Sequence, residues 1–403
     1  MNVALITPYF PDERTLDSGI ANHYQLLAQN LAAAGHHIVV VHVRPSYEHE
    51  QDTFSKHSPA SQITVLTFKV RVPAIINRLF KNQWAIVDMV LKLRCMLVTA
   101  GAIRGIIKEY HIQIIETSSY FSLCYFLSHK KIRIPLVVRV STTFSQMLTG
   151  HYPFKSRGMD LIAAMEIAFI KKSRQLITHA KSHAIELEKL YGLDARSFRI
   201  IAHGISIPTL KTRSGSDVTR VKVLYVGRLE YRKGTDVLLS AIPLVLQQCP
   251  HVFFELIGND PGNQNQREFE QKNETDILAR VSFRGRIDLT SLTNAYQSCD
   301  IFVAPSRYES FGLIFIEAMS FAKPAIGCAV GGVPDIIIDH YNGLFARPGD
   351  AQNLADMVIR LAKNESLRKV MGSNARKTVE ERFSGKKLAA DSIHYYQTLL
   401  VNT

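Results

Sequence analysis

"SRYESFGLIFIEAMSFAKPAIG" runs from Ser306 to Gly327 and carries two acids, Glu309 and Glu317, in mostly apolar surroundings. The apolar run before it, Ile301–Ala304, is typical of a buried strand, and the residues after Ser-Phe-Gly repeat at helical spacing. A buried carboxylate is costly unless it is paired or hydrogen-bonded. The stretch therefore predicts a strand, a loop and a helix of an α/β fold, with Glu309 in the loop and Glu317 inside the helix.

The two glutamates bracket the predicted start of that helix. Free backbone amides and the helix dipole attract an anionic group to such a terminus. A carboxylate can accept two hydroxyl hydrogen bonds, which suits the paired hydroxyls of a ribose or a hexose. The alternative is that Glu309 complements the helix dipole and Glu317 is a solvated helix acid, and the stretch alone leaves both interpretations open.

A second strand–loop–helix pattern, "YVGRLEYRKGTD", spans Tyr225–Asp236. Gly227 permits a tight turn, Arg228 and Lys233 supply positive charge, and Gly234 removes side-chain bulk at the start of a helix. The pattern predicts a clamp for a diphosphate, and the alternative is a basic surface turn with ordinary ion pairs. Thr235 or Asp236 is expected to cap the helix.

The chain has 403 residues, more than one hydrophobic core usually serves. Strands alternate with helices in both halves, and Gly19 opens the first helix as Gly234 opens one in the second half. We expect an α/β protein with two Rossmann-like, doubly wound parallel-sheet domains facing each other across a cleft. The expected divisions are 1–205, a linker at 206–220, 221–382, and a final segment at 383–403.

The net charge of +13 is concentrated in the first half, because residues 1–210 hold 24 Lys and Arg against 14 Asp and Glu. Such a half can face an anionic partner, but the sequence lacks the modules typical of nucleic-acid binding. No apolar run approaches the roughly 20 residues that span a bilayer, and the N-terminus does not resemble a signal peptide. Five scattered cysteines favour a reducing compartment, so a cytoplasmic protein is expected.

The stretch "AIINRLFKNQWAIVDMVLKLRCMLV" (residues 74–98) reads as one amphipathic helix with interleaved basic residues. One interpretation is peripheral contact with the anionic inner face of the cell membrane. The other is an ordinary helix that covers the sheet. Sedimentation with vesicles that contain or lack anionic lipid distinguishes the two.

The motifs "GRLEYRKG", "FRGRI", "APSRYESFGLIFIEAMSFAKPAIG", "VGGVPDII" and "NGLF", in this order, resemble glycosyltransferase family 4. The resemblance is specific over about residues 200–350 and looser before them. It implies a GT-B fold and a retaining hexosyltransferase that uses a UDP- or GDP-linked sugar and no cofactor or metal. It further implies a glycan or lipid-linked acceptor in cell-surface polysaccharide or lipopolysaccharide synthesis, and a last helix, around Ser392–Val401, that returns to the first domain.

The resemblance also implies roles for individual residues. Arg228 and Lys233 would hold the diphosphate, Glu309 the hydroxyls of the transferred sugar, and Glu317 those of the ribose. The remaining implied donor contacts are Gly19 and Gly227 at the phosphates, Arg286 and Ile287 at the base, and the amides of Phe311, Gly312 and Leu313 near sugar and phosphate.

Ser141 is the clearest departure from the family pattern. The family usually has a histidine near the reacting carbon, where this chain reads "LVVRVSTTFSQ". Three explanations stay open: Ser141 or Thr142 replaces the histidine as a hydrogen-bonding group, the alignment differs here, or activity is reduced. A catalytically weakened nucleotide-sugar-binding or scaffold protein is therefore the alternative function.

Overall fold

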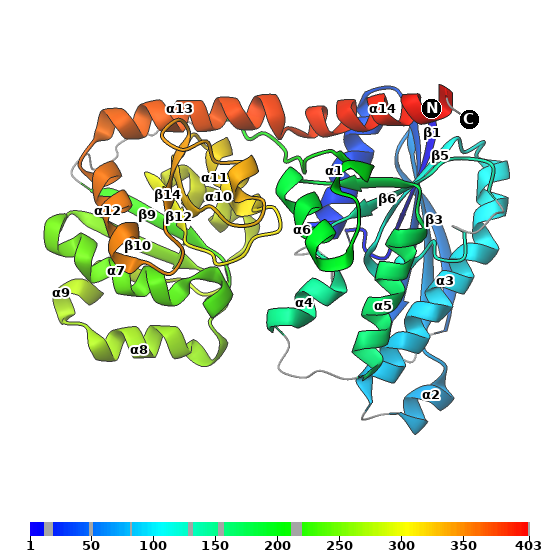
Figure 1. Ribbon diagram of the computed structural model, residues 1–403, viewed down its shortest axis with the longest axis horizontal. Helices are drawn as coiled ribbons and strands as arrows, with labels where there is room; N and C mark the ends of the chain where they lie inside the picture. The colour runs from blue at the N-terminus through cyan, green and yellow to red at the C-terminus, as the bar shows by residue number, and fades with distance from the viewer. Residues whose placement is uncertain are drawn as a thin grey trace. The chain divides into compact units, whose positions relative to one another are not determined.

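The computed structural model describes residues 1–11, 19–47, 51–80, 83–127, 132–151, 157–210 and 220–401. It divides into two compact units (Figure 1). Unit 1 comprises Met1–Gly204 and Gly385–Thr403, and unit 2 comprises Ile205–Ser384. Most of the predicted linker, residues 211–219, lies outside the described residues.

Unit 1 is built on an eight-stranded sheet with the order β3-β4-β2-β1-β5-β6-β7-β8. Its strands are β1 (Asn2–Thr7), β2 (His37–Ser46), β3 (Thr53–Ala60), β4 (Ile63–Arg71), β5 (Ile114–Ser118), β6 (Leu136–Val140), β7 (Gln175–Thr178) and β8 (Phe198–Ile200). The expectation of purely parallel strands is wrong for β3, which pairs antiparallel with β4 at the edge. Only Ser61 and Gln62 separate these strands, and so short a connection makes a hairpin and not a crossover.

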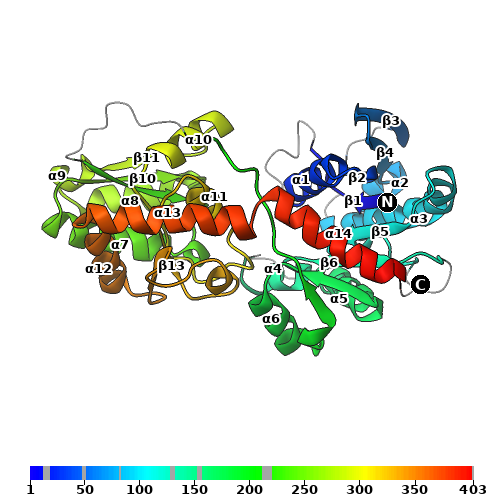
Figure 2. The same ribbon diagram turned by 90° about the horizontal axis from the view of Figure 1, so that it is seen from above.

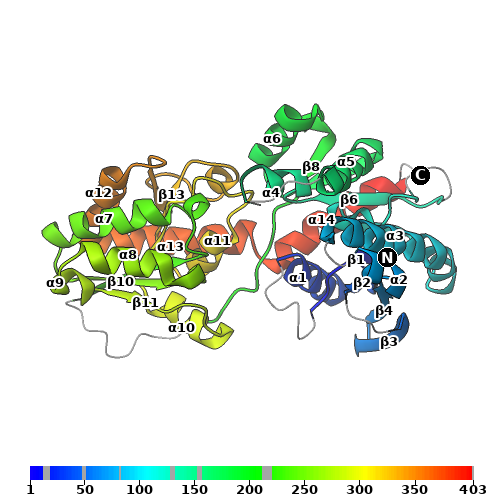
Figure 3. The same cartoon turned by 90° about the horizontal axis from the view of Figure 1, so that it is seen from below.

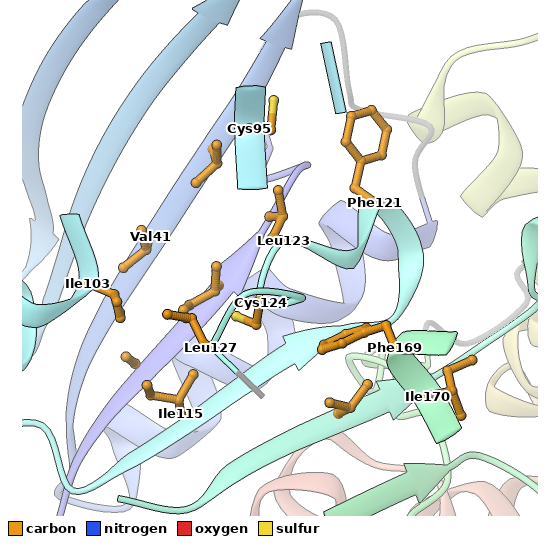
Figure 4. Packing of buried hydrophobic residues seen from close by; sticks show 14 of the residues in the cluster. Val41, Cys95, Ile103, Ile115, Phe121, Leu123, Cys124, Leu127, Phe169 and Ile170 are labelled. Atoms are coloured by element: carbon orange, nitrogen blue, oxygen red, sulfur yellow. The ribbon is translucent and has the colours of Figure 1, made fainter. Parts of the chain in front are cut away.

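Helices cover both faces of this sheet: α1 (Gly19–Ala33), α2 (Ala74–Leu79), α3 (Trp84–Glu109), α4 (Phe144–His151), α5 (Arg157–Lys172), α6 (Lys181–Tyr191) and α14 (Gly385–Val401). Side chains alternate between the faces along β1. Val3 and Leu5 pack in a cluster with α1 and α14. Ala4 and Ile6 belong to the cluster on the opposite face with α3, α5 and α6, part of which Figure 4 shows.

The expected single helix over residues 74–98 is wrong, because the chain forms α2 and then α3. The Phe80 amide closes α2 on the Ile76 carbonyl at 2.9 Å, and a new helix starts after Gln83. Periodicity does not reveal this division into two helices, since neither glycine nor proline marks it. The apolar side of α3 packs in the core, as expected of a sheet-covering helix.

Three apolar side chains at the start of this region are largely exposed: Ile75 (66%), Leu79 (67%) and Trp84 (69%). The membrane contact stays a prediction. Among the described residues, no helix is both long and apolar enough to cross a bilayer.

Unit 2 contains a six-stranded parallel sheet with the order β11-β10-β9-β12-β13-β14. The strands are β9 (Val221–Val226), β10 (Val252–Ile257), β11 (Val281–Phe283), β12 (Ile301–Ala304), β13 (Ala325–Cys328) and β14 (Gly343–Ala346). The expected bounds of β12 are confirmed. The chain order reverses between β9 and β12, and ligands of such sheets bind beyond the carboxyl ends of the strands at this switch point.

The helices of unit 2 are α7 (Thr235–Gln248), α8 (Gln264–Lys272), α9 (Thr275–Leu278), α10 (Leu289–Ser298), α11 (Leu313–Ser320), α12 (Ala351–Ala362) and α13 (Glu365–Arg382). Figure 3 looks onto the face that carries α7 and α8, and Figure 2 looks from the side of α13. Apolar residues of α7 and α12 pack together on the sheet. The predicted helix after Gly312 is confirmed as α11.

A buried polar network joins the chain's last helix to the sheet of unit 1. The Arg139 guanidinium on β6 lies 2.7 Å from Glu116 on β5, and the side chains are only 3% and 0% exposed. Tyr396 on α14 donates a hydrogen bond to Glu116 at 2.5 Å. The five cysteines are all free and buried, as the sequence predicts.

Candidate functional site

The loops that follow β9 and β12 meet at the switch point of unit 2. The Arg307 amide, after β12, donates to the Arg232 carbonyl, after β9, at 2.8 Å. Gly234 has a φ of +68°, and a Cβ there would lie 2.0 Å from the Pro305 carbonyl oxygen. Only glycine permits this approach, so the sequence at Gly234 fixes how closely the two loops can pack.

Lys233 and Glu309 form an ion pair across these loops. The Nζ of Lys233 lies 2.5 Å from Oε1 of Glu309, and the two side chains are 14% and 10% exposed. Ser306 donates to the same oxygen at 2.9 Å, and the amide of Gly332 donates to the Glu309 carbonyl. Glu309 is therefore a buried carboxylate with a defined countercharge, and its hydrogen bonds hold it in one orientation.

Arg228 lies at the open end of the loop after β9. Its side chain is 59% exposed and lies 3.2 Å from Glu230, which also pairs with Arg232 at 2.9 Å. The Tyr225 hydroxyl donates to the Arg228 carbonyl at 2.9 Å and so fixes the main chain beside Gly227. The guanidinium therefore remains accessible to an anionic ligand while its backbone is held.

The start of α7 differs from the expectation. The N-cap is Gly234, with no side-chain cap, so neither Thr235 nor Asp236 caps the helix. Thr235 is buried, and its hydroxyl donates to the Glu230 carbonyl at 3.3 Å. The Asp236 carboxylate instead binds a guanidinium in the loop after β12.

The guanidinium belongs to Arg307, a residue for which the sequence motifs predicted no role. It binds Asp236 through two hydrogen bonds of 2.6 and 2.8 Å and stacks over the Tyr231 ring at 3.7 Å. Its guanidinium also donates to the Tyr231 carbonyl. Arg307 therefore connects the loop that carries Lys233 to the loop that carries Glu309. In the sequence, its position two residues before Glu309 is the feature that could have indicated this role.

The start of α11 is formed by Phe311, Gly312 and Leu313. Gly312 is the N-cap with a φ of +107°, and Leu313 is the first helical residue. The Phe311 side chain is 3% exposed and packs against the Phe383 ring, so only its main chain can face a ligand. These amides occupy the helix terminus that the sequence predicts for an anionic group.

Glu317 lies one turn into α11 and has a different partner from Glu309. Tyr296 on α10 donates to its carboxylate at 2.8 Å. Burial raises the pKa of Glu317, and the hydrogen bond from Tyr296 opposes that shift. The two glutamates therefore do not form an acid–base pair in this structure, because each has its own partner from a different element.

Arg286 and Ile287 follow β11 at the same edge of the sheet. Arg286 is exposed and Ile287 is half-buried. The amide of Gly258, after β10, donates to the carbonyl of Gly285 at 2.9 Å. This hydrogen bond connects the main chain just before Arg286 and Ile287, the predicted base contacts, to the loop after β10.

The remaining predicted residues, Gly19 and Ser141, lie in unit 1. Gly19 is the exposed first residue of α1, and residues 12–18 before it lie outside the described part of the chain. Ser141 directly follows β6, where Val140 is in register with Thr178 of β7. Ser141 therefore lies at the carboxyl end of a strand, the edge where the sequence predicts ligand contacts.

Four histidines of unit 1, unforeseen from the sequence, have their rings in mutual contact. The rings of His179 and His183 lie 4.4 Å apart, those of His179 and His203 5.0 Å apart, and those of His23 and His203 4.8 Å apart. Thr178 shares a 2.7 Å hydrogen bond with Nδ1 of His183. Burial, and then the neighbouring His179, lowers the pKa of His183. The fold therefore disfavours the charged form of this ring.

The lowered pKa of His183 predicts that unit 1 loses stability in mild acid. An unfolded histidine binds a proton below about pH 6.5, whereas the lowered pKa of the folded His183 ring keeps it neutral to a lower pH, so stability is complete above about pH 6.5 and falls below it. Each pH unit over which only the unfolded ring is protonated costs about 1.4 kcal/mol. We expect His183→Gln to reduce the fall in Tm between pH 7 and 5, measured by circular dichroism. An equal reduction in His57→Gln, on the exposed β3, would contradict this assignment.

Among the described residues, no group of three or more His, Cys, Asp and Glu side chains could hold a metal ion. Arg228 and Lys233 bring positive charge to the switch point of unit 2, and the amides of α11 begin close to Glu309 in the chain. This arrangement can bind an anion flanked by hydroxyl groups.

Solved structures with the same architecture identify the fold. Sucrose-phosphate synthase from Thermosynechococcus elongatus is 21% identical, with a TM-score of 0.73 and full coverage of both chains. Anabaena HepE, solved in complex with UDP-glucose, is 17% identical, with a TM-score of 0.65 over 99% of this chain and 100% of that one. The fold is GT-B.

Sequence comparison then gives the family. The family model described as glycosyl transferases group 1 matches residues 206–378, and that of glycosyltransferase family 4 matches residues 18–207. An uncharacterized glycosyltransferase of Methanocaldococcus jannaschii is 26% identical over 98% of both chains. Glycogen synthase of Mycobacterium tuberculosis is 24% identical over 98% of this chain and 94% of its own. The chain belongs to the glycosyltransferases of this group 1 and family 4 type.

Proposed function

We propose that this glycosyltransferase is a retaining, metal-independent enzyme that moves a hexose from a UDP- or GDP-linked sugar to a hydroxyl of a glycan or lipid-linked acceptor. The proposed setting is the cytoplasmic side of cell-surface polysaccharide or lipopolysaccharide synthesis. The observation that carries the proposal is the Lys233–Glu309 pair, which joins a cation and a hydroxyl-binding carboxylate at the switch point.

The proposed reaction breaks the bond between the sugar's anomeric carbon and the diphosphate, and it forms a bond from that carbon to the acceptor oxygen. Negative charge grows on the departing diphosphate, and the ring becomes oxocarbenium-like. Arg228, Lys233 and the α11 amides stabilise that charge. Glu309 holds sugar hydroxyls and Glu317 holds those of the ribose, while the departing phosphate accepts the acceptor's proton.

A donor screen tests the proposal. Thermal melts with UDP- and GDP-linked hexoses are expected to show stabilisation by the correct donor, about 2.7 kcal/mol at a hundredfold excess over Kd. Assays of donor hydrolysis and transfer follow with that donor. Stabilisation by none of these donors, together with no hydrolysis or transfer, would reject the proposed function.

Chelation tests the metal-independent part separately. Because Arg228, Lys233 and helix amides supply the positive charge, we expect transfer to persist in excess EDTA. The measurement is the initial rate before and after chelation, with readdition of Mg²⁺ or Mn²⁺ as the control. A rate that disappears with EDTA and returns with metal would overturn this part.

The second candidate function is a nucleotide-sugar-binding or scaffold protein. It rests on Ser141, a short side chain directly after β6 where the family pattern has a histidine. This candidate predicts thermal stabilisation by a donor without hydrolysis or transfer. The same screen therefore separates the two functions.

A further inference from the structure

Arg307 forms hydrogen bonds to the chain on both sides of Lys233. Its main-chain amide donates to the Arg232 carbonyl at 2.8 Å, and its guanidinium donates to the Tyr231 carbonyl at 2.7 Å. The same guanidinium binds the two carboxylate oxygens of Asp236 at 2.6 and 2.8 Å. These three partners lie within three residues of Lys233, so its main chain is held from before and from after.

The turn that carries Lys233 gains little from core packing. It is a short 3₁₀ turn, Tyr231–Lys233, in which each residue is at least partly exposed, and such turns have poorer hydrogen-bond geometry than an α-helix. Tyr231 is 72% exposed, and the Arg307 guanidinium lies over its ring, 3.7 Å from the centroid. A guanidinium can stack on an aromatic ring while it binds a carboxylate through two N–H groups. Arg307 therefore gives this turn packing as well as hydrogen bonds.

The loop that carries Arg307 and Glu309 is held by contacts that do not involve Lys233. Ser306 donates to the Glu309 carboxylate, and the Gly332 amide donates to the Glu309 carbonyl at 2.9 Å. A Cβ at Gly331 would lie 1.8 Å from that carbonyl oxygen, so the loop after β13 packs directly against the Glu309 main chain. Because Arg307 belongs to this fixed loop, it determines where the Lys233 turn lies relative to Glu309.

We propose that Arg307 is a positioning residue for sugar transfer, an assignment that rests on the proposed function. It acts through Lys233, whose ammonium it keeps beside Glu309 and in reach of the departing diphosphate. A charge that stabilises a transition state has to be in place before the reaction. Because a lysine side chain is long and flexible, its charge stays in place only when the main chain that carries it is fixed. A displacement of about 1 Å at such a group can lower the rate by about 10²-fold.

The alternative is an ordinary surface ion pair. The Asp236 side chain is 50% exposed and that of Arg307 is 22% exposed. The hydrogen bond from Arg307 lowers the pKa of Asp236, which keeps this carboxylate charged. Exposed ion pairs contribute little to stability. The two interpretations therefore differ in what they predict for the position of Lys233 and for the rate of transfer.

Acetylation tests the position of Lys233 without a donor. The full chain is treated with the N-hydroxysuccinimide ester of acetic acid, and mass spectrometry of its peptides gives the labelling rate of each lysine. Lys233, with a side chain that is 14% exposed, should react slowly compared with Lys369, which is 75% exposed. Arg307→Ala and Asp236→Ala should each raise the labelling rate of Lys233 several-fold and leave that of Lys369 unchanged.

Steady-state kinetics tests the same role in the reaction. Arg307→Ala is expected to lower kcat roughly tenfold to a hundredfold with the donor KM nearly unchanged, because Lys233 acts on charge that develops in the transition state. The double variant Arg307→Ala with Asp236→Ala should be no slower than Arg307→Ala, since the two residues act as one unit. Arg307→Lys keeps a positive charge for Asp236 and should recover part of the rate.

Arg368→Ala is the matched control. Arg368, on α13 of unit 2, also donates to two main-chain carbonyls, those of Leu361 and Ala362 at 2.6 and 2.8 Å. It lies outside the loops after β9 and β12, so its kcat and its Lys233 labelling rate should match those of the wild type. A melting curve of each variant checks its folding.

Three results would overturn the assignment: wild-type labelling of Lys233 in Arg307→Ala, an unchanged kcat in that variant, or a double variant whose loss is the sum of the two single losses. Failure of the proposed function gives a different result, a wild-type chain that neither hydrolyses nor transfers any donor. The labelling experiment then still decides whether Arg307 fixes Lys233, because it requires no turnover.

Discussion

Arg228→Ala is expected to lower kcat for sugar transfer by roughly 10²–10³-fold while leaving the melting temperature nearly unchanged. The side chain is 59% exposed, and among the described residues its ion pair is with Glu230 at the surface, so its removal disturbs little packing. A preorganised cation at the departing diphosphate is worth about 3–4 kcal/mol in the transition state, whereas an exposed ion pair contributes about 0–1 kcal/mol to stability. Steady-state kinetics with saturating donor measures this difference directly.

Arg347→Ala is the matched control. Arg347 also lies in unit 2, pairs with Asp350 at 2.9 Å and is 74% exposed, but it is not in the loops after β9 or β12. We expect its turnover to match that of the wild type. If Arg228→Ala behaves like Arg347→Ala, the loop after β9 is a basic surface turn and not a diphosphate clamp.

Arg139→Met is expected to lower the free energy of unfolding of unit 1 by about 3–5 kcal/mol. The change leaves Glu116, which is fully buried, without its countercharge. Among the described residues, the Tyr396 hydroxyl then remains as its side-chain hydrogen-bond donor, at 2.5 Å. Denaturant unfolding followed by circular dichroism gives the free energy. Tyr396→Phe removes one hydrogen bond to a charged group and should cost about 1.5–3 kcal/mol.

The double variant Arg139→Met with Glu116→Leu separates pairing from packing. Replacing both charges of a buried pair with apolar groups is often neutral or stabilising, so the double variant should recover much of the loss. Arg347→Met, on the surface, should change the free energy by about 1 kcal/mol at most. A loss below 1 kcal/mol for Arg139→Met would show that water or another group compensates Glu116.

Local pattern predicted the elements of the candidate site well. The strand before Glu309, the helix after Gly312 and the loop from Gly227 to Gly234 lie where the sequence puts them, because periodicity and glycine act over a few residues. Local pattern did not predict hydrogen-bond partners that lie far away in the sequence. Asp236 was expected to cap its own helix, but it binds Arg307, which is 71 residues away in sequence.

The sequence by itself determined the two α/β halves, the family resemblance and the residue types at the switch point, since these depend on local spacing and on motifs read in order. Only the tertiary structure decided that Lys233 pairs with Glu309, 76 residues later, and that Tyr396 reaches Glu116, 280 residues earlier. Strand order sets the first pairing, because parallel strands bring distant loops to one edge. The packing of α14 against the sheet of unit 1 sets the second. The two acids that stood out in Ser306–Gly327 therefore have separate partners, which no local spacing could reveal.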